Sequence, residues 1–83
     1  MVRSFSAWKA QAVLRLLAIK AAHREEKVGE VVDNLLAKIQ YLRVRDLPSF
    51  LVLLHFASTL TEEFLSVLPS EEEVEEWFRR GEE

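Results

Sequence analysis

The side chain best suited to chemistry is His55, because it interrupts the most apolar run of the chain. If the surrounding stretch, residues 48–68, forms one helix, Thr59 and Glu62 lie on the same side as His55 and could form a small polar network with it. A threonine between a histidine and a glutamate on one helix makes neither a substrate pocket nor an oxyanion site. We therefore expect no catalytic residues and no enzymatic activity.

Metal and cofactor sites also lack the residues that they need. His55 and Glu62 supply too few ligands for a metal ion, and His23 lies far away along the chain. There are no cysteines, which excludes a thiolate zinc site and a disulfide framework. No phosphate-binding, dinucleotide-binding or hydrolase motif is present. We expect no metal and no cofactor.

Basic side chains in the first half of the chain could contact phosphates. Four of them share a narrow arc if the first helix continues to residue 27, although apolar residues interrupt that arc, and two more lie at the end of the second helix. Any soluble helix carries some charged surface, so nucleic-acid association is the alternative function rather than the first one. The candidate phosphate contacts are Lys9, Lys20, Arg24 and Lys27, with Arg43 and Arg45.

Charge is unevenly divided along the chain. Residues 1–46 contain nine basic and five acidic side chains, whereas residues 47–83 contain two basic and nine acidic ones. The formal net charge is -3, so the composition as a whole gives no argument for nucleic-acid binding. A chain with a basic and an acidic half favours self-association or a partner selected by charge.

The low content of turn-forming residues indicates the fold class. Two glycines and two prolines in 83 residues favour a few long helices over a sheet with many hairpins. The length fits one domain, 1–83. The hydrophobic pattern predicts an all-α, small four-helix bundle, with helices at about 6–23, 28–45, 48–68 and 70–80.

The stretch 48–68 is predicted to be the central helix. It is apolar nearly all round, and such a helix must be covered on nearly all sides. Pro48 disfavours a helical conformation at Leu47, so we expect the chain to turn there. One alternative stays open: Thr59 and Glu62 have capping-box spacing, so a new helix could begin near Thr59.

The last helix has the clearest local signals. Ser70 and Glu73 have capping-box spacing, and Gly81 is well placed to end the helix. Trp77 and Phe78 either complete the core or form a docking anchor, and the sequence does not decide between the two.

An excess of apolar residues over the available interior predicts association with another chain. Hydrophobic residues make up 49% of the sequence, and the first helix is apolar on two sides. Uncovered apolar surface usually marks a binding site. We therefore expect a non-enzymatic protein–protein interaction module, either a homodimer or a small subunit of a larger assembly. The face expected to bind the partner consists of Trp8, Ala12, Leu16 and Ile19.

The membrane and the cell exterior are not expected locations. A membrane span needs ~20 apolar residues, and His55, Glu62 and Glu63 interrupt the central stretch. The first residues are too few and too polar for a signal peptide, so we expect a cytoplasmic protein. The scarcity of thermolabile residues beside abundant charge fits a thermophilic source.

Overall fold

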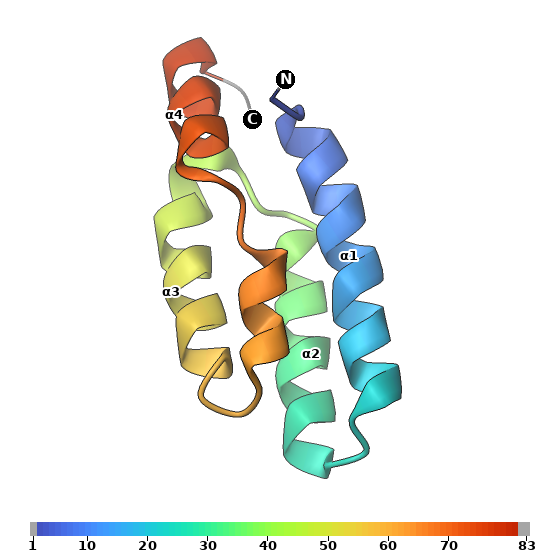
Figure 1. Ribbon diagram of the computed structural model, residues 1–83. Helices are drawn as coiled ribbons and strands as arrows, with labels where there is room; N and C mark the ends of the chain where they lie inside the picture. The colour runs from blue at the N-terminus through green and yellow to red at the C-terminus, as the bar shows by residue number, and fades with distance from the viewer. Residues whose placement is uncertain (1, 82–83) are drawn as a thin grey trace.

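The structure, a computed structural model, describes residues 2–81 and is a bundle of helices (Figure 1). No strand occurs among these residues, which confirms the predicted all-α class. The α-helices are α1 (Phe5–Ala22), α2 (Glu26–Ile39), α3 (Leu47–Ala57) and α4 (Glu71–Arg80), and two 3-10 helices, η1 (Val44–Asp46) and η2 (Glu62–Val67), precede and follow α3.

Helices α1 and α2 form a hairpin, and local hydrogen bonds hold its two ends. The Ser4 hydroxyl caps α1 by accepting a hydrogen bond from the Ala7 amide at 3.0 Å. Helix α2 ends at Ile39 and not at residue 45 as predicted. Beyond Ile39 the backbone leaves the helix, so that Leu42 and Val44 both reach the core. The Lys9 ammonium donates to the Leu42 carbonyl at 3.0 Å and holds this segment against α1.

The prediction of one continuous helix over 48–68 is wrong. Helix α3 begins at Leu47, which is helical despite the following proline, and it ends at Ala57. The hydroxyls of Ser58 and Thr59 donate to the carbonyls of His55 and Phe56, at 2.5 and 2.7 Å. The last carbonyl oxygens of an α-helix have no amide partner within the helix, and these two hydroxyls supply one. The hydroxyls therefore favour the end of α3 at this point.

The alternative interpretation of residues 48–68, in which a second helix begins after a break, describes the chain better. The capping residue is Thr61 rather than Thr59, since the Thr61 hydroxyl accepts the Glu63 amide at 3.4 Å. The turn before it folds η2 back alongside α3 (Figure 1). Phe64 and Val67 of η2 are almost fully buried and pack towards α1 and α3. The middle of the bundle is thus occupied by η2 and not by α3.

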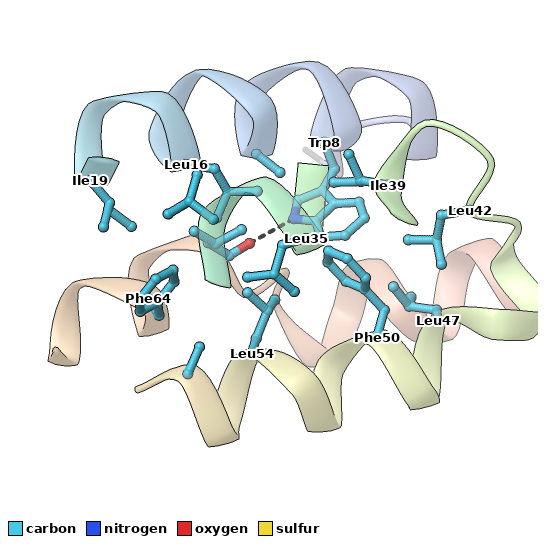
Figure 2. Close-up of a cluster of buried hydrophobic side chains, with 14 of the residues drawn as sticks. Trp8, Leu16, Ile19, Leu35, Ile39, Leu42, Leu47, Phe50, Leu54 and Phe64 are labelled. Carbon is cyan, nitrogen blue, oxygen red and sulfur yellow. Dashed lines mark hydrogen bonds between the residues drawn. The ribbon is translucent and has the colours of Figure 1, made fainter. Parts of the chain in front are cut away.

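A buried aromatic cluster joins the two ends of the chain to α3. Trp8 has ring-centroid distances of 5.8 Å to Phe5, 6.1 Å to Phe50 and 5.7 Å to Trp77. Its indole N–H donates to the Val67 carbonyl at 2.8 Å (Figure 2). The Trp77 indole likewise donates to the Arg3 carbonyl at 2.8 Å. Both indole N–H groups therefore have partners, as burial requires.

Helix α4 has the ends that the sequence predicted. Ser70 and Glu73 form a full capping box, and Gly81 follows the helix with a left-handed φ of 69°. Trp77 is completely buried, whereas its neighbour Phe78 is about half exposed. Trp77 is thus a core residue and Phe78 a surface residue.

The two leucines at positions 53 and 54 test the orientation of α3. Leu54 is 0% exposed and Leu53 is 37% exposed. We expect Leu54→Ala to lower the free energy of unfolding by ~2–5 kcal/mol, because it leaves a cavity. The matched control Leu53→Ala should lower it by less than ~1 kcal/mol. Urea denaturation followed by tryptophan fluorescence measures both, and equal losses would contradict the described orientation.

Candidate protein interaction surfaces

The partner-binding face predicted on the first helix is wrong. Trp8, Ala12, Leu16 and Ile19 are all buried within their own chain. This side of α1 packs against α2 and η2 (Figure 2). Trp8 carries the largest apolar surface of the helix, and its burial gains the most free energy inside the domain.

The opposite side of α1 is apolar and exposed. Leu14 is 67% exposed and Leu17 is 48% exposed. Three exposed alanines extend this stripe with alternating spacings of three and four residues, which keep the side chains on one face of a helix. This surface, the α1 outer face, consists of Ala7, Ala10, Leu14, Leu17 and Ala21.

Helix α3 presents a second exposed apolar surface. Val52 is 54% exposed and Phe56, one turn further on, is 69% exposed. Together with neighbouring side chains they line a shallow pocket. This surface, the α3 outer face, consists of Leu51, Val52, His55, Phe56 and Thr59. The sequence interpretation missed it because it assumed that so apolar a helix is covered by its own chain.

A groove between α3 and α4 continues from the α3 outer face. Leu51 and His55 line both pockets, so the two surfaces are contiguous. The groove also contains apolar side chains from the start of α4 and the segment before it, and two exposed glutamates. This surface, the α3–α4 groove, is completed by Leu68, Pro69, Val74, Glu71 and Glu75.

The two outer faces lie on opposite sides of the domain. In Figure 2, α1 and α3 lie on either side of the buried cluster. Leu16 of α1 and Leu54 of α3 both point into it, so the exposed sides of these helices point apart. Helices α2 and η2 contact both of them. The α1 outer face and the α3 outer face are therefore separate surfaces.

The polar residues considered from the sequence are divided between two elements, although His55 and Thr59 line one pocket. His55 and Thr59 belong to α3 and its terminal turn, whereas Glu62 belongs to η2. The Thr59 hydroxyl is bonded to the Phe56 carbonyl. Within residues 2–81 no group of three or more His, Cys, Asp or Glu side chains could hold a metal ion.

The basic residues predicted to contact phosphates do not share one arc. Because α1 ends at Ala22, Arg24 lies in the following loop and Lys27 on α2. Lys9 is bonded to the Leu42 carbonyl, and Lys20 pairs with Asp33 at 2.8 Å. Arg24, Lys27, Arg43 and Arg45 are exposed, the last two beside and within η1.

Two ion pairs hold distant segments together. His23, after α1, lies 2.6 Å from a carboxylate oxygen of Glu63 in η2, which raises the pKa of His23. Arg3 donates two hydrogen bonds to Glu73, at 2.6 and 2.8 Å, and the Ser70 amide donates a third at 2.9 Å. The Arg3 guanidinium is the main cause that lowers the pKa of Glu73 to about 2.

Glu73 is expected to stabilise the fold at neutral pH and to lose that effect in acid. Its pKa of about 2 lies below the ordinary 4.5, so the stabilisation is present above 4.5 and disappears as pH falls through 2. Glu73→Gln should cost about 1.5–3 kcal/mol at pH 7, since it weakens charge-assisted bonds. The exposed neighbour Glu72→Gln is the control. Urea unfolding of both variants at neutral and acid pH tests this, and equal losses would refute the role of Glu73.

His23 is expected to give the opposite pH dependence. The pKa of His23 is raised above its ordinary value of 6.5 in the folded state. The pair with Glu63 therefore stabilises the fold fully at pH values below 6.5, and this stabilisation is lost as the pH rises through the folded-state pKa. His23→Gln should therefore lower the Tm in mildly acidic buffer and leave it unchanged in alkaline buffer. Glu63→Gln should do the same and the control Glu62→Gln should not. A pH-independent effect of His23→Gln would contradict the pairing.

Comparison with known proteins identifies no relative. No protein-family model, curated protein or solved structure matches this chain. Within residues 2–81, none of the helices combines the length and the apolar character that a bilayer-crossing segment needs. What the protein does must therefore be inferred from its own surfaces.

Proposed function

We propose that this protein is a non-enzymatic protein–protein interaction module and that the α3 outer face is its main binding surface. The observation that carries this proposal is the exposure of Val52 and Phe56, one helical turn apart, beside a pocket that they line. Contiguous exposed apolar side chains on a domain surface usually mark a binding site.

The chemistry of the surface suits a helical partner. Phe56 is a rigid aromatic anchor of the type that dominates interface energies. Apolar grooves of this kind accept the apolar side of an amphipathic helix. Glu71 and Glu75 in the adjoining α3–α4 groove favour a partner with basic residues beside its apolar stripe.

The absence of an enzymatic role is supported by the positions of the polar side chains. The Thr59 hydroxyl is bonded to a carbonyl of its own helix, and Glu62 belongs to a different element from His55. Association with nucleic acid has less support, because Lys9 and Lys20 are bonded within the domain and the remaining basic residues are dispersed. Salt-sensitive binding to DNA or RNA would favour that alternative.

Purification from the native source, with identification of the bound protein, supplies a partner for the test. Binding of that purified partner is then measured by calorimetry. Phe56→Glu should weaken it by ~100-fold or more, as expected for an interface anchor. Because Phe56 is 69% exposed, the variant should keep its fold, which circular dichroism checks. The control is Asn34→Glu, at an exposed position of α2, and this variant should bind the partner as the unmodified chain does.

Unchanged binding by the Phe56→Glu variant would contradict the proposal. If Phe56→Glu and Asn34→Glu bind the purified partner as tightly as the unmodified chain does, the α3 outer face is not the binding surface. Recovery of nucleic acid alone, lost at raised salt, would replace the proposal with the alternative function.

A further inference from the structure

On the basis of the proposed function, we infer that the partner is an amphipathic helix of another protein, with its basic residues gathered at one end. Its apolar residues cover the α3 outer face, and its basic end lies in the α3–α4 groove beside Glu71 and Glu75. The groove thereby selects the partner by the charge pattern along its helix.

The α3 outer face and the α3–α4 groove form one continuous apolar surface. Leu51 and His55 line both of them. Val52 and Phe56 are exposed at the α3 end, and the half-buried Val74 continues the apolar lining onto α4. Grooves that bind a helix take up apolar side chains spaced three or four positions apart. A partner helix of several turns can therefore contact both surfaces together.

Carboxylates are confined to one end of this surface. The α3 outer face has no Lys, Arg, Asp or Glu among the described residues that line it, whereas the α3–α4 groove contains Glu71 and Glu75 and no lysine or arginine. These two glutamates are exposed and lie one helical turn apart, where like charges repel each other. Basic residues of a partner would relieve that repulsion, and they are favoured only at this end.

The basic residues of α4 do not neutralise the carboxylates of the groove. Arg79 lies one helical turn beyond Glu75, but it bonds to Glu76, as does Arg80 at 2.7 Å. Within residues 2–81, neither Glu71 nor Glu75 makes an ion pair. Both carboxylates can therefore pair with lysine or arginine side chains of a partner.

A second copy of this chain is a poorer partner than another protein. The α1 outer face contains only alanine and leucine, so it offers no cation to the groove. Arg24, after the end of α1, lies in a pocket together with Glu25 and Glu26. Pairing of two α3–α4 grooves would bring like charges together, which selects against that arrangement.

Selection from a random peptide library displayed on phage tests the inferred chemistry of the partner. The immobilised unmodified protein is the target, and enriched peptides are synthesised and measured by fluorescence anisotropy. They should carry apolar residues three and four positions apart, with lysine or arginine gathered at one end. Phe56→Glu should abolish their measurable binding, since it removes the apolar anchor.

Charge reversal then tests the two carboxylates of the groove. Glu71→Lys with Glu75→Lys should weaken binding of the selected peptides by ~10-fold, and the difference should shrink with added salt. The matched control is Glu26→Lys with Glu30→Lys, at the first residue of α2 and one turn later, as Glu71 and Glu75 are in α4. These control positions are exposed and lie outside the groove, so that variant should bind normally. Circular dichroism verifies that both variants fold.

A compensating change in the peptide completes the test. Peptides whose basic residues are replaced by glutamate should bind the groove variant more tightly than they bind the unmodified chain. Equal weakening of the original peptides by both double variants would reflect net charge alone and would overturn the inference.

The other outcomes separate the inference from the proposed function. Enriched peptides that are neutral or acidic, or a library without enrichment, would overturn the inference. The proposed function would stand if Phe56→Glu still abolished binding of the peptides or of the purified natural partner, and it would fail as well if neither binding changed. A dimer of the unmodified chain that Phe56→Glu converts into a monomer in sedimentation equilibrium would identify a second copy as the occupant and overturn the inference.

Discussion

The hydrogen bond from the Trp8 indole to the Val67 carbonyl determines much of this structure. It joins the first turns of α1 to the last residue of η2 inside the aromatic cluster, where an unpaired donor or acceptor would be costly. It holds η2 against α1 after the chain has reversed direction beyond Ala57. That reversal in turn decides which side of α3 faces inward, with Leu54 buried and Phe56 exposed. The proposed binding surface is thus a consequence of a contact on the other side of the core.

The parts of the fold that depend on neighbouring residues could be predicted from the sequence. The Ser70–Glu73 box and Gly81 are complete signals within one helix, and their positions agree with the structure. The break after Ala57 accompanies a contact between residues 8 and 67, and residues 48–68 contain no glycine or internal proline that would predict it. Local hydroxyl caps at Ser58 and Thr59 were a weak signal, because serine and threonine also occur within helices.

The candidate surfaces were only partly predictable, for a related reason. The sequence showed that α1 is apolar on two sides, and the excess of apolar residues pointed to surface left uncovered. It did not say which side would be buried, because that depends on where α2 and η2 pack. The size of Trp8 was the available clue, since the largest aromatic side chains gain most from burial. For α3, the assumption that an apolar helix is covered by its own chain concealed Val52 and Phe56.

The long sequence separation of the key contacts constrains the order in which the molecule can be completed. Arg3 meets Glu73 across 70 positions, and Trp8 meets Val67 across 59. Bringing such distant residues together has a large loop-closure entropy, so this helical protein should fold more slowly than a bundle with only local contacts. On the ribosome the α1–α2 hairpin can form early, but the buried side of α1 gains the rest of its cover only after η2 and α4 have emerged. Until then the nascent chain exposes part of the buried side of α1 together with its outer face, and chaperones that bind apolar segments would bind there.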